Sequence, residues 1–184
     1  MSTKHDAHDP GAGILGELIG DDTIRFSRIF RAPRGRVWDA LLTPDGLRAW
    51  LGEATVDARP GGAFVIQWDE RDAMEGRIVE LDEPRRLLIA WHETRSGEPA
   101  RNATTAEDES SLSFELEALD EATTRLVLVH RLIRRDKLAG IGGGWHAHLD
   151  ALAAALAGST VDIEAAYIAV LSRYEALLAG PVQT

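Results

Sequence analysis

Two kinds of hydrophobic periodicity, separated along the chain, constrain the fold of this protein more than any other feature of its sequence. Residues 23–31 (TIRFSRIFR) and residues 111–119 (SLSFELEAL) alternate apolar and polar side chains, which is typical of half-buried strands. Nearer the C-terminus the period changes, because Trp145, Leu149 and Leu152 recur at helical spacing. Together these periods predict an α+β fold in which a sheet covers one face of a long helix.

An antiparallel meander is predicted between and after the two alternating segments. Turn residues such as Gly61 and Gly62 separate short runs that are rich in apolar residues, and short turns favour antiparallel neighbours. The additional strands are expected at residues 54–60, 63–68, 74–81, 87–93 and 123–132. Residues 94–109 contain no large apolar residue, which predicts a long surface loop that is either a lid or disordered.

Helical patterns lie on both sides of this meander. After the first strand, Pro33 begins a short helix and a second helical turn follows it. Near the C-terminus, glycines at 142–144 precede the long helix, and each helical glycine costs about 0.8–1 kcal/mol relative to alanine. We interpret these glycines as a flexible segment that precedes the helix. The alternative is that their lack of side chains leaves room for a ligand or a strand. Gly158 ends this helix, and Ser159 with Asp162 forms a capping-box pattern that opens one more.

These patterns divide the chain into three parts. Residues 1–13 have no periodicity and predict a flexible tail, and residues 14–158 form the main domain. Residues 159–184 add a C-terminal helix that packs on the domain or on a partner subunit. Because the apolar stripe of this helix exceeds what the domain core needs, we expect a homodimer.

Composition limits the classes of function. The 184 residues carry a formal charge of −10 at pH 7, which disfavours nucleic acid and anionic lipid as partners. The chain has no cysteine, so thiolate catalysis and cysteine-bound zinc are excluded. No apolar run is long enough to span a bilayer, and the N-terminal segment is too acidic for an export signal. We therefore expect a soluble, cytoplasmic protein of bacterial type.

Several local motifs resemble one family. In order along the chain they are FSRIFRAPRGRVWDALLTPDGLRAWLG, DARPGGAF, GRIVELDEPRRLLIAW, TRLVLVHRL and GGGWHAHLDALAAAL. They are similar to the family related to the C-terminal domain of the activator of heat-shock protein 90 ATPase, within the START-like, SRPBCC superfamily. The resemblance covers residues 15–156 and implies a helix-grip fold, in which a curved antiparallel sheet wraps round a long C-terminal helix and encloses a hydrophobic cavity.

Aromatic and apolar side chains are the candidates for lining this cavity. All five tryptophans lie within the region of resemblance, and each of them either packs in the core or contacts a ligand. The sequence does not fix which strand faces point inward. The candidate ligand-binding residues are Trp38, Trp50, Phe64, Ile66, Trp68, Ile78, Ile89, Trp91, Phe114, Leu128, His130, Trp145 and Leu149.

His130 is the best polar candidate in the predicted cavity. It lies on the same strand face as Leu128, where an imidazole can donate or accept a hydrogen bond, act as a general base, or simply be a bonded core residue. The candidate polar groups around it are Glu80, Glu93, Arg77 and Arg131.

Metal binding is not expected. His146 and His148 are two residues apart on a helix, so their side chains point to opposite sides and cannot share one ion. No nucleophile accompanies the histidines at a recognisable spacing, and we assign no catalytic residue and expect no cofactor.

Three functions remain open from the sequence. The first is a module that binds an apolar or aromatic small molecule in the cavity. The second is an enzyme of cyclase, hydratase or hydrolase type that uses His130 with a glutamate. The third is an interaction module resembling the co-chaperone, which contacts a partner protein through its surface.

Overall fold

The computed structural model describes residues 14–68, 72–91, 93–95 and 110–179. Within this part of the chain one antiparallel sheet runs in the order β1-β2-β9-β8-β6-β5-β4-β3, and β7 pairs with β5. Its strands are β1 (Glu17–Ile19), β2 (Thr23–Phe30), β3 (Glu53–Val56), β4 (Ala63–Gln67), β5 (Asp72–Asp82), β6 (Arg86–Ala90), β7 (Glu93–Arg95), β8 (Ser111–Ala118) and β9 (Thr124–Arg131). The helices are α1 (Arg34–Leu42), α2 (Pro44–Arg48), α3 (Leu138–Leu156) and α4 (Ile163–Leu178), and the 3-10 turn η1 (Arg135–Lys137) precedes α3.

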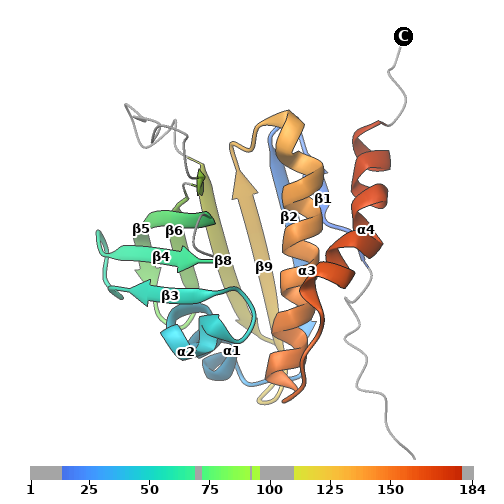
Figure 1. Cartoon of the computed structure of the whole chain (residues 1–184). Coiled ribbons are helices and arrows are strands. Elements are labelled where there is room, and N and C mark those ends of the chain that lie inside the picture. The colour runs from blue at the N-terminus through green and yellow to red at the C-terminus, as the bar shows by residue number, and fades with distance from the viewer. Residues whose placement is uncertain (1–13, 69–71, 92, 96–109, 180–184) are drawn as a thin grey trace, which may run out of the picture.

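The sheet curves around α3, as Figure 1 shows, and α1 and α2 close one end of the space between them. Helix α4 packs against α3 on the side away from β3 and β4. This arrangement confirms the predicted α+β, helix-grip fold. One detail differs, because the short strand β1 precedes the strand that was expected to be first. The predicted tail at 1–13 and most of the predicted loop at 94–109 lie outside the described residues.

Side chains on the inner face of the sheet form apolar rows that cross several strands. In one row Ile24 lies opposite His130, His130 opposite Leu112, Leu112 opposite Ile89, and Ile89 opposite Ile78. All five side chains are at most 1% exposed. A polar imidazole therefore stands in the middle of an apolar row that joins β2 to β5.

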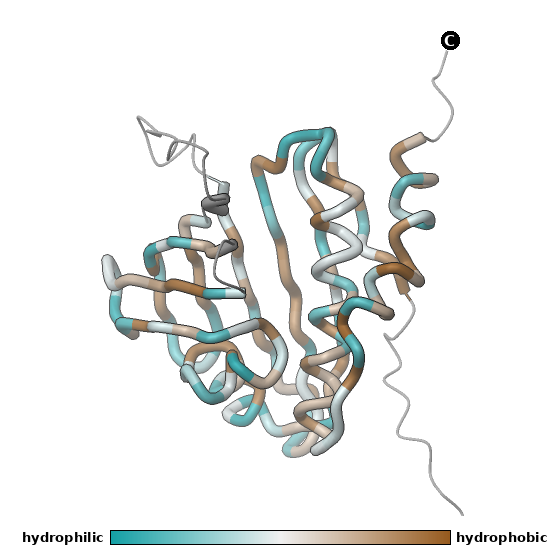
Figure 2. Tube along the Cα trace, in the orientation of Figure 1, coloured by the Kyte–Doolittle hydropathy of each residue, from teal (hydrophilic) through white to brown (hydrophobic). Residues whose placement is uncertain are grey.

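The predicted sheet-facing stripe of α3 is buried on these rows. Trp145, Leu149 and Leu152 are between 0% and 4% exposed, and Leu156 packs on the same core while partly exposed. In Figure 2 hydrophobic positions recur along both β9 and α3, which lie side by side. Burial of a large apolar side chain contributes about 1.5–3 kcal/mol, so this stripe holds α3 on the sheet.

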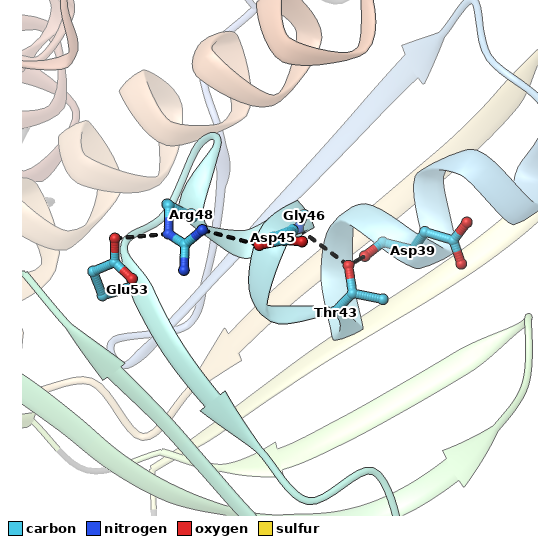
Figure 3. A network of polar contacts seen from close by, with 6 residues as sticks. All are labelled: Asp39, Thr43, Asp45, Gly46, Arg48 and Glu53. Carbon is cyan, nitrogen blue, oxygen red and sulfur yellow. Dashed lines mark hydrogen bonds and ion pairs between the residues drawn. The ribbon is translucent and has the colours of Figure 1, made fainter.

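Thr43 forms the corner between α1 and α2. Its hydroxyl donates a hydrogen bond to the carbonyl of Asp39 at 2.7 Å and accepts one from the N–H of Gly46 at 3.1 Å (Figure 3). A side chain at Gly46 would collide with the Asp39 carbonyl oxygen. One threonine thus ends the first helix and caps the second.

Arg48 fixes the direction in which the chain leaves this corner. Its guanidinium contacts Asp45 at 2.9 Å and Glu53, the first residue of β3, at 2.7 Å (Figure 3). Exposed ion pairs of this kind contribute little to stability because solvent screens them, so their role is to orient the segment between them. That segment carries Trp50 and Leu51, which are 1% and 4% exposed and pack into the end of the core.

The three consecutive glycines lie inside α3, not before it. The helix begins at Leu138, so the prediction that residues 142–144 form a flexible lead-in is wrong. A Cβ atom at Gly142 would lie 2.8 Å from Cδ1 of Ile24 and 2.8 Å from Cδ1 of Tyr174. One at Gly143 would lie 3.0 Å from Cε2 of Tyr167. These two glycines therefore let β2 and α4 approach the helix closely.

Gly144 differs from its neighbours because no atom lies within 4 Å of a Cβ placed there. We expect Gly144→Ala to raise the free energy of unfolding by about 1 kcal/mol, since alanine favours the helix and meets no neighbour. We expect Gly142→Ala to lower it, because overpacking costs about 1–3 kcal/mol and exceeds the gain in helix propensity. Urea denaturation of both variants tests this, and equal shifts would contradict the asymmetric environment of the two glycines.

A side-chain cap fixes the start of helix α4. The carboxylate of Asp162 accepts a hydrogen bond from the N–H of Ala165 at 3.0 Å, so the cap is Asp162 itself and not the predicted Ser159. Ser159 instead donates to the carbonyl of Ala154 at the end of α3. Gly158, with φ of +74°, makes the reversal between the two helices, as predicted.

A buried polar contact joins α4 to both α3 and the N-terminal strand region. The Tyr174 hydroxyl accepts a hydrogen bond from the N–H of Gly16 at 2.8 Å and lies 3.2 Å from Nδ1 of His146. The other ring nitrogen of His146 faces the carboxylate of Asp150 at 3.7 Å. Because Tyr174 is only 1% exposed, these contacts fix α4 at one position along α3.

The apolar stripe of α4 is only partly covered within the chain, since Val170 and Tyr174 are buried whereas Ile168 and Leu177 are 64% and 45% exposed. The expected homodimer stays a prediction. Among the described helices, none is both long enough and apolar enough to cross a bilayer.

Candidate functional site

A pocket of about 350 Å³ opens to solvent beside the N-terminal half of α3. Three side chains from the sheet side form one wall. Trp68 directly follows β4, Trp91 directly follows β6, and Leu51 comes from the segment after α2. The ring centroids of Trp68 and Trp91 lie 6.3 Å apart. The sheet side of the pocket is therefore apolar and mostly aromatic.

Helix α3 forms the opposite wall. The pocket is lined by Gly140, Ile141, Gly144, Trp145 and His148, which share one side of the helix. Gly140 and Gly144 lie about one turn apart and add no side chains to this wall. Ile141 and Trp145 give this wall apolar contacts, which favour an aromatic or apolar ligand beside them.

Helix α4 and η1 complete the pocket at its outer end. Tyr167 of α4 lines the pocket, and its hydroxyl lies 3.6 Å from a Cβ placed at Gly140. Asp136 and Lys137 of η1 line the same end. The Asp136 carboxylate is held by the guanidinium of Arg134 at 2.8 Å and 3.0 Å, and this hydrogen bonding lowers its pKa.

Trp145 connects the pocket to the core. Its ring centroid lies 5.4 Å from that of Trp91, 6.0 Å from that of His130 and 6.3 Å from that of Phe114. Its indole N–H donates a hydrogen bond to Nδ1 of His130 at 2.9 Å. Aromatic pairs of this geometry contribute about 0.5–1.5 kcal/mol each beyond their buried area, so this cluster stabilises the pocket wall.

His130 lies behind this wall with both ring nitrogens in hydrogen bonds. Because Nδ1 accepts from Trp145, the proton is on Nε2, which donates to Oγ of Ser110 at 2.8 Å. The Ser110 hydroxyl in turn donates to the carbonyl of Arg131 at 3.0 Å. Burial lowers the pKa of His130 to about 3, so the ring is neutral at pH 7.

His148 is oriented by a different contact. Its Nδ1 lies 2.7 Å from the carbonyl oxygen of Trp50, which can only accept, so Nδ1 carries the proton. Burial lowers the pKa of His148, and the bond to Trp50 acts in the opposite direction. The neutral ring therefore keeps a lone pair on Nε2, and no hydrogen bond to that atom is found among the described residues.

The structure brings three of the predicted ligand-binding residues together at the pocket, namely Trp68, Trp91 and Trp145. The other predicted lining residues fill the interior between the sheet and α3, where they pack against one another. They are Trp38, Trp50, Phe64, Ile66, Ile78, Ile89, Phe114, Leu128, His130 and Leu149, each at most 3% exposed. Three of the five tryptophans thus line the pocket, and Trp38 and Trp50 pack in the core.

Three of the four predicted polar groups do not line the pocket. A bulge in β5 between Ile78 and Glu80 reverses the side-chain alternation, so Glu80 is on the outer face, paired with Arg86 at 3.0 Å. Arg77 and Arg131 are exposed. Glu93 belongs to β7, and its side chain lies outside the described part of the structure.

Leu51, His148 and Tyr167 also line the pocket and were not predicted to do so. The sequence does hold a signal for the α3 wall. Lys137, Gly140, Gly144 and His148 recur at helical spacing, which would place them on one side of a helix that began early enough. Tyr167 has no such signal, since its position depends on how α4 packs. Within the described residues no group of three or more histidine, aspartate or glutamate side chains gathers to hold a metal ion.

Fold and pocket together define a START-like domain of the helix-grip type. The chain belongs to the family of activator of Hsp90 ATPase homolog 1-like proteins, whose model matches residues 31–157. The match ends before α4, so Tyr167 lies outside the part that the family model covers.

Solved structures support the same fold. CalU16 from Micromonospora echinospora is 24% identical with a TM-score of 0.65, and the similarity covers 90% of this chain and 96% of CalU16. The protein encoded by gene BPP1335 of Bordetella parapertussis is 26% identical with a TM-score of 0.65, covering 91% and 94%. Protein CV1439 from Chromobacterium violaceum is 26% identical with a TM-score of 0.57, covering 73% and 96%. No curated protein matches the chain.

Proposed function

We propose that this protein binds an apolar or aromatic small molecule in the pocket beside α3. One observation carries the proposal. Three tryptophans, Trp68, Trp91 and Trp145, surround a space whose helical wall is kept open by Gly140 and Gly144. Helical glycine costs about 1 kcal/mol relative to alanine, and at Gly144 no neighbouring atom accounts for the absence of a side chain. Space for a ligand would explain why a helix-destabilising glycine occupies this position.

An enzyme that uses His130 as a general base has less support. A general base needs a lone pair within reach of a substrate proton, whereas the His130 Nδ1 lone pair accepts from Trp145. Glu80 is on the other face of the sheet. The co-chaperone-like interaction module remains a hypothesis, and no feature of the described residues favours it specifically.

The pocket can be tested by filling it. In Gly144→Leu the new side chain enters open space on a helix, so the variant should fold and should lose ligand binding. Gly35→Leu is the matched control, because Gly35 also lies in a helix with nothing within 4 Å of its Cβ, and it does not line the pocket.

Intrinsic tryptophan fluorescence reports the outcome, since three indoles line the pocket. Titration with biphenyl, naphthalene and fatty acids should give a saturable change in emission for the wild type and for Gly35→Leu, and none for Gly144→Leu. Saturable binding that is equally strong in Gly144→Leu would place the ligand elsewhere and would overturn the proposal.

A further inference from the structure

The pocket beside α3 has polar groups of opposite hydrogen-bonding character at its two ends. Lys137 and His148 are eleven positions apart on the same side of the helix, which corresponds to about 16 Å along its axis. Between them lie Gly140 and Gly144, which add no side chains to the wall. The pocket is therefore an elongated groove along α3, and its middle is apolar.

The His148 end accepts hydrogen bonds. The contact between Nδ1 and the Trp50 carbonyl fixes the proton on that nitrogen and leaves the Nε2 lone pair without a partner among the described residues. The imidazole is held in place by edge contacts with Trp50 and Trp145, whose ring centroids both lie 6.4 Å away. A fixed acceptor at the end of an apolar groove selects ligands that carry an O–H or N–H group there.

The opposite end donates hydrogen bonds and is positively charged. Lys137 immediately precedes α3 and lines this end of the pocket, where its ammonium group can donate hydrogen bonds. The Tyr167 hydroxyl reaches the same end, beside Gly140. The negative charge of Asp136 is offset by its two hydrogen bonds from Arg134. This end suits a carboxylate.

We propose that the groove recognises an elongated aromatic molecule with a hydrogen-bond donor at one end and a carboxylate at the other. His148 accepts from the donor, Lys137 and Tyr167 bind the carboxylate, and the tryptophans contact the rings between them. This inference rests on the proposed function, because it specifies the ligand class of the same pocket.

Four related probes separate the contributions of the two ends: biphenyl, 4-hydroxybiphenyl, biphenyl-4-carboxylate and 4′-hydroxybiphenyl-4-carboxylate. Dissociation constants are measured by tryptophan fluorescence and by calorimetry. In the wild type the hydroxyl should strengthen binding of the carboxylate probe about three- to tenfold. The carboxylate should also strengthen binding, and this effect should weaken at high salt.

Two variants assign these effects to residues. In His148→Asn the amide can still donate to the Trp50 carbonyl while the Nε2 acceptor is lost, so the hydroxyl should no longer strengthen binding. In Lys137→Gln the carboxylate effect should fall, and binding of biphenyl should not change. Arg135→Gln is the matched control for the loss of one positive charge. Arg135 belongs to the same 3-10 turn as Lys137, but it pairs with Asp21 and does not line the pocket.

The outcomes distinguish the two proposals. If none of the four probes binds, the proposed function fails, and this inference fails with it. If all four bind with the same affinity, or if the variants weaken every probe equally, aromatic binding stands and the assignment of polar ends is wrong. A hydroxyl effect lost only in His148→Asn and a carboxylate effect reduced only in Lys137→Gln would support the inference.

Discussion

Replacing Trp145 with alanine is expected to lower the free energy of unfolding by about 3–5 kcal/mol. Trp145 is 4% exposed and contacts aromatic rings from β8, β9, the end of β6 and its own helix. Its removal leaves a large cavity between α3 and the sheet. It also leaves the buried Nδ1 of His130 without its donor, which costs about 1–3 kcal/mol for a buried polar group.

Trp68→Ala is the matched control, because Trp68 lines the same pocket but is 38% exposed. Its loss should cost about 1 kcal/mol or less, as for most surface substitutions. Trp145→Phe separates ring burial from the hydrogen bond, since phenylalanine keeps most of the apolar area and lacks the N–H donor. Chemical denaturation measures all three variants. Similar losses for Trp145→Ala and Trp68→Ala would show that the central position of Trp145 is misassigned.

Mild acid is expected to destabilise the protein well before its carboxylates titrate. Burial lowers the pKa of His130 to about 3, and burial together with nearby Arg28 and Arg173 lowers that of His146 to about 4. In the unfolded chain both groups return to about 6.5. Between these values the unfolded state binds more protons than the folded state, so stability rises with pH and is fully present only above about 6.5.

Each of these two histidines should remove about 2 kcal/mol of stability between pH 7.5 and pH 5. Denaturation at several pH values measures this slope. In His146→Asn the amide oxygen can still accept from Tyr174 and no group titrates, so the slope should become shallower by the contribution of one histidine. An unchanged slope in this variant would mean that His146 does not resist protonation in the folded state.

The sequence predicted an antiparallel sheet packed on a long helix because its elements have strong and separate periods, and the family resemblance implied the helix-grip fold. Leu112 and Phe114 alternate with polar residues, Trp145 and Leu149 follow helical spacing, and turn residues divide the strands. These signals are local, so they can be recognised without knowledge of the tertiary structure. The start of α3 was missed because local signals count glycine as unfavourable in a helix. The neighbours that require glycine at positions 142 and 143 come from β2 and α4, which are distant in the sequence.

The candidate site was harder to predict because its members depend on long-range geometry. Strict alternation along β5 would place Glu80 on the same face as Ile78, but one bulge between them reverses that relation. His130 was recognised as buried and polar, yet only its contacts with Trp145 and Ser110 show that both nitrogens are occupied. Tyr167 could not be placed at the pocket without knowing where α4 packs.

The family match covers less of the chain than the sheet and helices of the domain do. The family match starts at residue 31, just after β2 ends, and stops at residue 157, before α4 begins. A fragment trimmed to those limits would lose the strand that pairs with β9, and it would expose the hydrogen-bonding edge of β9 to other molecules. Such a fragment should aggregate. A fragment that keeps both β2 and α4 also keeps the hydrogen bond between the Gly16 amide and the Tyr174 hydroxyl, two groups 158 residues apart in the sequence.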